Sequence, residues 1–241
     1  MSPLFAHSEV TGLIQVESWR AKTWLVHGFT TRQAGDFATL DAVPRAMKTW
    51  GTGELTFESV RQTHSDRVHV SEGVLVQDGD RPEADAIITR GQGRVISVRT
   101  ADCLPLLFVD ETRRAIAAVH AGWRGTAQQI TQRAVERMRD EFGSRPQDLE
   151  VAIGPGIGVC CYEVGPDVAD EFPASSVQHE QRPHLDLVAE NRRQLIDSGV
   201  APEQIHATAL CTHCRSDLFH SHRRDGAAAG RMMAVIGALP M

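Results

Sequence analysis

Short apolar runs bounded by turn residues recur along most of the chain. They are rich in β-branched side chains, which favour strands because they pack well on a pleated surface. The runs occupy residues 24–30, 68–72, 85–90, 94–99, 103–110, 115–122, 149–154, 205–210 and 232–237. This pattern predicts a strand-rich protein.

Two other segments carry apolar residues at helical spacing. One helix is predicted from Thr126 to Phe142, with Gly143 as its stop, and a second from about Leu185 to Ser198, ending at Gly199. Because the strands come in groups and do not alternate with helices, we predict an α+β fold with mixed β-sheet layers flanked by helices. We expect a single domain over residues 1–241. The glycine-rich turn at 90–95 further predicts a hairpin over residues 85–99.

Composition narrows the class of protein. Hydrophobic residues make up 41% of the 241 residues and charged residues 23%, as in ordinary globular proteins. A net charge of −6 argues against a nucleic-acid partner. The apolar runs are too short to span a membrane, and the N-terminal residues lack the basic and apolar regions of a secretory signal. We therefore expect a cytoplasmic protein without a membrane partner; the oligomeric state stays open.

Three side chains stand out as candidate chemistry. His64 and His120 each lie where an apolar run gives way to a turn, and Cys103 directly precedes the run 104–109. Two imidazoles and one thiolate form a set of three zinc ligands that leaves a fourth position open, as in catalytic zinc sites. The same residues also suit a second interpretation, in which His120 deprotonates Cys103 as a nucleophile.

The remaining cysteines suggest a second candidate metal or redox site. Cys211 and Cys214 form a C-x-x-C motif with His213 between them, followed by His220 and His222. A structural zinc site needs four ligands, and only one C-x-x-C is present, so the sequence favours a non-metal role for it. Cys160 and Cys161 are adjacent, and adjacent side chains of a strand point to opposite faces. We expect at most one of them to face any site.

Several ordered motifs carry a family resemblance. They are RQTHSD, EADAIIT, RTADCLPLLFVD, AAVHAGWRGT, AIGPGIGVCCYEVG and FHSHRRDGAAAGRMMAVIG. In this order they resemble the laccase-domain family of purine nucleoside phosphorylases, the YfiH-like proteins formerly labelled multicopper polyphenol oxidases. The resemblance runs from about residue 24 to the C-terminus. Two positions depart from the family pattern: His222 replaces a tyrosine, and His213 replaces an aromatic residue.

The resemblance implies a zinc enzyme. The metal would be held by His64, Cys103 and His120, which would also be the catalytic residues; copper is a possible substitute. The implied reactions are phosphorolysis of purine nucleosides, including methylthioadenosine, and deamination of adenosine. The partners would be purine nucleosides and phosphate. Alternative functions are a copper polyphenol oxidase, an editing hydrolase for peptidoglycan precursors, and a non-enzymatic domain with a structural metal.

Phosphate is an anion, and an acidic protein needs a local cation to bind it. Arginine can bind phosphate through two parallel hydrogen bonds. The candidates lie in the motifs beside the ligands or near the C-terminus: Arg61, Arg124, Arg223, Arg224 and Arg231. We favour Arg61 and then Arg223 as substrate-binding residues.

Asp102 and Glu163 are candidate general acids or bases. The glycine-rich residues 153–158 are predicted to form a tight turn.

Overall fold

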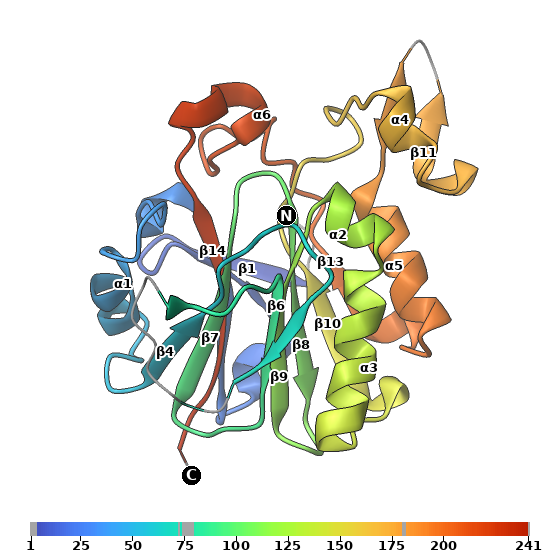
Figure 1. Ribbon diagram of the computed structural model, residues 1–241. Helices are drawn as coiled ribbons and strands as arrows, with labels where there is room; N and C mark the ends of the chain where they lie inside the picture. Colours follow the sequence, from blue (N-terminus) through green and yellow to red (C-terminus); the bar gives the residue numbers. More distant parts are fainter. Residues whose placement is uncertain (1–3, 72, 74–79, 180–181, 241) are drawn as a thin grey trace.

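Two six-stranded sheets form the centre of the molecule (Figure 1). The computed structural model describes residues 4–71, 73, 80–179 and 182–240, so Glu72, in the predicted run 68–72, lies outside the described residues. The first sheet has the order β1 (Phe5–Ser8), β2 (Leu13–Val16), β3 (Leu25–Thr30), β14 (Met232–Ala238), β7 (Arg94–Thr100) and β4 (Thr56–Ser59). The second has the order β13 (Ile205–Ala207), β10 (Leu149–Ile153), β8 (Leu104–Asp110), β9 (Ala115–Ala121), β6 (Ala86–Thr89) and β5 (Val68–Val70).

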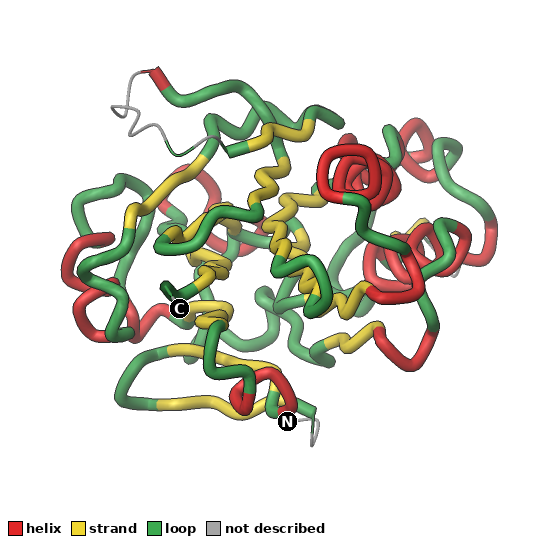
Figure 2. The backbone as a smooth tube through the Cα atoms, turned by 90° about the horizontal axis from the view of Figure 1, so that it is seen from below, coloured by secondary structure: helices red, strands yellow, loops and turns green. Residues whose placement is uncertain are grey.

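Helices cover the outer faces of the two sheets, and Figure 2 shows them on opposite sides of the strands. The α-helices are α1 (Val43–Thr49), α2 (Trp123–Ala127), α3 (Ile130–Phe142), α4 (Pro166–Ala169), α5 (Leu187–Asp197) and α6 (His222–Asp225). The 3-10 turns are η1 (Ser18–Ala21), η2 (Arg32–Ala34), η4 (Pro146–Asp148), η5 (Ala174–Ser176), η6 (Pro202–Gln204) and η7 (Gly226–Ala228). A separate antiparallel pair joins β11 (Val177–His179) to β12 (Pro183–Leu185). The predicted α+β architecture of mixed sheets flanked by helices is confirmed.

Successive side chains of the central strands point to opposite faces, and this alternation divides the core into layers. In β8, Leu107 and Val109 face the first sheet, whereas Leu106 and Phe108 face the helices α3 and α5. Strand β14 divides in the same way between the inter-sheet core and the layer under α1. Strands buried on both faces consist of nearly continuous apolar residues, so they are easy to predict from the sequence. No helix of the described ranges has the length and apolarity needed to cross a membrane.

The predicted helix over 126–142 is wrong in one respect, because the structure divides it. Helix α2 ends at Ala127, and Gln129 adopts a left-handed backbone with φ of 64° before α3 begins. The carbonyl of Thr126, which a continuous helix would offer to residue 130, instead accepts hydrogen bonds from the amide of Gln129 and from Nε2 of Gln194 in α5. Tertiary contact with α5 thus interrupts the helix. The predicted stop at Gly143 is confirmed, with φ of 69°.

The second predicted helix agrees closely with α5, whereas the predicted hairpin over 85–99 is wrong. Asp186 caps α5 by accepting a hydrogen bond from the amide of Ala189 at 2.9 Å, and Gly199 follows it with φ of 93°. Strands β6 and β7 belong to different sheets: β6 pairs with β5 and β9, and β7 pairs with β4 and β14. Both faces of these strands are apolar, so the chain buries more surface by crossing between the sheets than by folding back within one.

His27 gives the fold a titratable group inside the core. Its ring is buried at 1% exposure beside Trp19, and its Nε2 accepts a hydrogen bond from the amide of Val16 at 3.0 Å. Burial lowers the pKa of His27 to about 4, and the charge of Arg20 acts in the same direction. The folded protein therefore keeps this imidazole neutral at pH values where the unfolded chain protonates it.

We predict that stability falls as the pH drops from about 6.5 to about 4. Across this window the His27 imidazole is protonated in the unfolded state but not in the folded state. This difference lowers the free energy of unfolding by roughly 3 kcal/mol. Urea denaturation at several pH values measures the effect. The variant His27→Gln keeps an acceptor for Val16 but does not titrate, so its stability should depend less steeply on pH. An equal slope in the variant and the wild type would contradict this assignment.

Candidate metal and substrate site

Three elements bring His64, Cys103 and His120 together at one end of the sheets. His64 lies in the loop that crosses from β4 in the first sheet to β5 in the second, Cys103 directly precedes β8, and His120 is near the end of β9. Strands β8 and β9 pair with Leu104 opposite Ala121, which brings Cys103 beside the end of β9. The three donor atoms lie within 4.8 Å of one another, with Nε2 of His64 4.0 Å from Sγ of Cys103.

A buried carboxylate, Asp85, organises two of these three side chains. Its Oδ1 lies 2.8 Å from Nδ1 of His120 and accepts the backbone amide of His64 at 3.0 Å. Its Oδ2 accepts the amides of Thr63 and Ser65 and the hydroxyl of Ser65. These bonds hold His64 in a left-handed backbone conformation, with φ of 59°, which costs free energy in a non-glycine residue. Asp85 thereby leaves Nε2 as the nitrogen of His120 that is available to a metal.

The electrostatics of the site favour a thiolate. Burial raises the pKa of Cys103, but the charge and hydrogen bonds of His120 and His64 outweigh this effect and bring the pKa to about 6. Burial likewise lowers the pKa of His120, yet Cys103 and Asp85 raise it to about 9. Although burial raises the pKa of Asp85, hydrogen bonds from His120 and Ser65 hold it at about 2. The thiolate is the form that binds a metal and the form that attacks as a nucleophile.

The donor set and the space around it fit a zinc ion. Zinc bonds nitrogen at about 2.0–2.1 Å and thiolate sulfur at about 2.3 Å, so donors a few ångströms apart can share one ion. Gly122 leaves the necessary room: a Cβ atom at this position would lie 2.7 Å from Sγ of Cys103 and 3.2 Å from Cδ2 of His64. Asp85 supplies the outer partner that orients a histidine ligand.

The three donors face a cavity of about 600 Å³. Arginines from three segments also line it, together with small residues near the C-terminus; the lining comprises Ala38, Arg61, Gln62, His64, Arg99, Thr100, Ala101, Cys103, His120, His222, Ala227, Ala229 and Arg231. Arg61, which we predict to bind substrate, lies in this lining and forms an ion pair with Glu83. Helices α2 and α6 lie at this end of the molecule, at the top of Figure 1.

Arg223, the second predicted substrate-binding residue, is placed differently. Its guanidinium group lies 5.2 Å from the centre of the Tyr162 ring and donates to the carbonyl of Glu163 at 2.8 Å, outside the lining of the cavity. Of the other candidate arginines, Arg124 lies over the Trp123 ring. Arg224 donates to backbone carbonyls of the loop 212–219 and pairs with its neighbour Asp225.

The predicted acid–base candidates have structural partners. Asp102 adopts φ of 86° and accepts hydrogen bonds from the hydroxyls of Thr212 and Ser221 and from the amide of Arg223. Its position beside Cys103 makes it an orienting group. Glu163 is on the surface, 2.7 Å from Arg182. The predicted tight turn at 153–158 is wrong: Ile153 still belongs to β10, Gly156 bridges to Cys211, and the chain turns only at residues 159–161. The segment runs through the core, where a Cβ at Gly154 would lie 2.3 Å from the Phe29 ring.

Sequence reasoning missed Asp85, Gly122 and Arg99. Asp85 carries a detectable signal, because it is an acid placed directly before the largely apolar strand β6. Gly122 lies in the HAGW motif, but only the structure shows that its missing side chain makes room for Cys103. Arg99 lies at the end of a predicted strand, and nothing in the sequence indicates that it lines the cavity. In the structure it also donates to the carbonyl of Ala38 at 2.8 Å.

The expectation for the adjacent cysteines is wrong. Cys160 and Cys161 lie in a turn, where neighbouring side chains need not point to opposite faces. Both thiols lie beside Cys214, and the sulfurs of Cys160, Cys161, Cys211 and Cys214 are all within 4.8 Å of one another.

Known proteins share this fold and about a third of the aligned residues. The crystal structure of the Bacillus licheniformis hypothetical protein YfiH matches with a TM-score of 0.86 at 29% identity, covering 98% of this chain and 99% of the other. The two six-stranded sheets flanked by helices therefore define a YfiH-like fold. Residues 38–239 match the family described as multi-copper polyphenol oxidoreductase laccase, and the chain belongs to that family.

Two named relatives extend the comparison. A purine nucleoside phosphorylase from Bacteroides thetaiotaomicron is 33% identical over 257 residues, covering 93% of this chain and 95% of the relative. A protein named adenosine deaminase RL5, from an unknown prokaryotic organism, is 38% identical over 186 residues, covering 71% of each chain. The family resemblance noted in the sequence is confirmed.

We predict that Asp85→Asn weakens zinc binding about 10- to 100-fold, the usual effect of losing an outer partner of a histidine ligand. The amide cannot accept from His120 and from the 63–65 backbone as the carboxylate does. Isothermal titration of the metal-free protein with zinc measures the affinity. Asp110→Asn is a matched control, since Asp110 is equally buried but lies at the opposite end of β8. Wild-type affinity in the Asp85 variant would contradict the role assigned to Asp85.

We also predict that Gly122→Ala displaces the Cys103 thiol and lowers zinc affinity at this site. The added Cβ cannot coexist with Sγ at 2.7 Å, so the thiol must turn away. The backbone φ of Gly122 is −76°, which alanine adopts readily, so the melting temperature of the metal-free protein should change little. Zinc titration and thermal denaturation test the two halves of this prediction. Unchanged zinc affinity would contradict it.

Proposed function

We propose that this chain is a zinc-dependent purine nucleoside phosphorylase that also deaminates adenosine and phosphorolyses methylthioadenosine. The observation that carries the proposal is the convergence of His64, Cys103 and His120 on the wall of a cavity that arginines also line. The relatives named purine nucleoside phosphorylase and adenosine deaminase support both reactions. We further propose that the enzyme acts in the cytoplasm.

Phosphate would bind on the arginine side of the cavity. Arg61, Arg99 and Arg231 come from three separate segments, and together they give a protein of net charge −6 a local cationic surface. The guanidinium of Arg61 forms an ion pair with Glu83. The guanidinium of Arg231 instead donates from Nη1 to the carbonyls of Ala229 and Gly230. These backbone bonds hold the Arg231 guanidinium in place, so it is a better preorganised phosphate ligand than Arg61. A pair of arginines can hold the anion through several charged hydrogen bonds.

The purine would occupy the side of the cavity lined by small residues. Ala101, Ala227 and Ala229 leave room for a flat ring and contribute apolar surface. His222 lies in the same lining, where its imidazole can donate a hydrogen bond to a ring nitrogen. In phosphorolysis, a phosphate oxygen forms a bond to the anomeric carbon while the carbon–nitrogen bond to the purine breaks, and the departing purine needs a proton. In our proposal, His222 would stabilise that leaving group.

The three donors would hold the metal, and Asp85 would position the two histidines. A zinc ion with one open position acts as a Lewis acid and lowers the pKa of a bound water toward 7, which is what deamination at C6 of adenine requires. The thiolate of Cys103 would offset part of the positive charge of the ion. Asp102 would fix the backbone of Cys103, because its side chain and carbonyl bind Thr212, Ser221 and Ile157.

The alternative of a multicopper oxidase finds little support in the donor sets. A multicopper cluster needs many histidines in adjacent pairs. Within residues 4–71, 73, 80–179 and 182–240, three or more histidine, cysteine or acidic donors gather in two groups, one with two histidines and the other with cysteines alone. A single ion at the first group is the arrangement these residues support. Zinc is the metal we propose, with copper as the competing occupant.

We predict that Cys103→Ala lowers inosine phosphorolysis by more than about 100-fold, beyond the usual loss from an outer partner. The reaction is followed by the appearance of hypoxanthine and ribose 1-phosphate. Zinc added back to the metal-free wild type should restore activity, whereas zinc added to the variant should not. Retained turnover in the variant would refute the site, and stoichiometric copper without zinc in the purified wild type would refute the metal.

A substrate panel separates the proposed reactions. Inosine, guanosine, adenosine and methylthioadenosine are each incubated with and without phosphate, and the products are identified. Release of free base should require phosphate, whereas conversion of adenosine to inosine should not. A peptidoglycan precursor and a phenol belong in the same panel: turnover of either in place of the nucleosides would replace the proposed function by one of its alternatives.

A further inference from the structure

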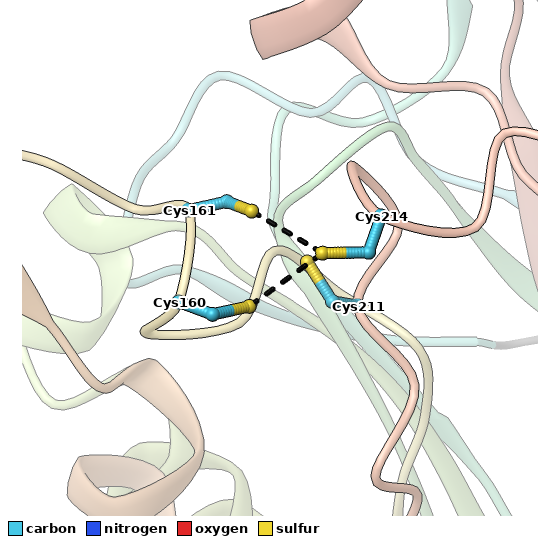
Figure 3. A group of neighbouring side chains, drawn as sticks. All are labelled: Cys160, Cys161, Cys211 and Cys214. Carbon is cyan, nitrogen blue, oxygen red and sulfur yellow. Dashed lines mark hydrogen bonds between the residues drawn. The ribbon is translucent and has the colours of Figure 1, made fainter.

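A second cluster of metal-binding side chains lies in the loops above the sheets. Figure 3 shows the thiols of Cys160 and Cys161, from the turn after residues 153–158, pointing toward those of Cys211 and Cys214, from the loop between β13 and α6. The Sγ atom of Cys214 is 3.7 Å from that of Cys160 and 3.3 Å from that of Cys161. All four sulfurs lie within 4.8 Å of one another.

These separations lie around the value found in a tetrahedral metal–thiolate site. With zinc–sulfur bonds of about 2.3 Å, the sulfurs of such a site lie roughly 3.8 Å apart. A disulfide would require about 2.05 Å, and all four cysteines are free thiols. We propose that these four cysteines bind one zinc ion as a structural site, separate from the site of His64, Cys103 and His120. Because the protein supplies all four ligands, no position is open to substrate.

The backbone around the cysteines is shaped for this role. The amide of Gly158 donates to Sγ of Cys211 at 3.2 Å, a contact that stabilises a metal-bound thiolate. A Cβ at Gly158 would crowd Sγ of Cys160 and Cβ of Cys211, both at 3.3 Å, so glycine lets the two loops approach. The C-x-x-C segment closes on itself through the amide of Arg215, which donates to the carbonyl of Cys211 at 3.1 Å.

The proposed site would fasten the loop that supports Cys103. Thr212, inside the C-x-x-C, donates from its hydroxyl to Oδ1 of Asp102 at 2.6 Å and from its amide to the carbonyl of Gly156 at 2.9 Å. Asp102 in turn holds the left-handed backbone next to Cys103. The same loop continues to His222, which lines the cavity. A zinc ion on the four cysteines would therefore fix one wall of the catalytic site without contacting substrate.

Counting the metal in three proteins tests the proposal. The full chain, purified without added metal and then equilibrated with zinc and desalted, should hold two zinc ions per chain by inductively coupled plasma mass spectrometry. The double variant Cys211→Ser/Cys214→Ser should hold one, and Cys103→Ala should also hold one. His213→Ala is a matched control inside the same motif, and it should hold two because its imidazole is not in the donor group.

Cobalt substitution identifies which site remains. In Cys103→Ala, cobalt should give the intense sulfur-to-metal absorption of a four-thiolate site, and in Cys211→Ser/Cys214→Ser this absorption should be lost. If the double variant does not fold, alkylation of the wild type replaces it. Zinc should then protect Cys160, Cys161, Cys211 and Cys214 from iodoacetamide, and removal of zinc by a chelator should expose them.

Three results would overturn the proposal. They are one zinc per wild-type chain with none in Cys103→Ala, alkylation of the four cysteines at equal rates with and without zinc, and disulfides among them in the protein purified under reducing conditions. None of these results depends on turnover of a nucleoside. The four-cysteine site can therefore fail while the proposed enzyme stands, and the enzyme can fail while this site stands.

Discussion

The candidate site depends on a single buried carboxylate, that of Asp85. It accepts the amides of Thr63, His64 and Ser65 while it binds Nδ1 of His120, so one side chain ties the crossover loop to β9. A charged carboxylate is stable in such a place only because every oxygen is hydrogen-bonded. The same bonds offset the cost of the left-handed conformation at His64 and leave Nε2 of His120 free for chemistry.

A second acid has the equivalent role for the third donor. Asp102 holds the backbone next to Cys103 and is itself held by Thr212, Ser221 and the amide of Arg223. The two acids belong to different loops, yet each couples a strained backbone position to hydrogen-bond donors that are distant in sequence. The positions of the three donors are therefore set by long-range contacts, and the proposed four-cysteine site reinforces the contacts of Asp102.

The sheets supply the rigidity that this arrangement needs. Strands β8 and β9 are buried on both faces, between the first sheet on one side and α3 and α5 on the other. Cys103 lies directly before β8 and His120 near the end of β9, so rigid strands hold both donors, whereas His64 comes from a loop and His222 from the start of α6. Sites built where rigid strands meet loops combine precise donors with an adaptable cavity.

Local sequence determined most of the strands, the C-terminal stop of α3, the extent of α5 and the three candidate donors, because burial on both faces and helix stops leave a direct pattern in the residues. Only the tertiary structure decided the rest. The break at Gln129 depends on Gln194, the separation of β6 from β7 depends on which sheet offers more buried surface, and the grouping of Cys160 with Cys214 depends on loops 54 residues apart. Such contacts form between segments whose own sequences carry no record of their partner, so they follow from the packing of the whole chain.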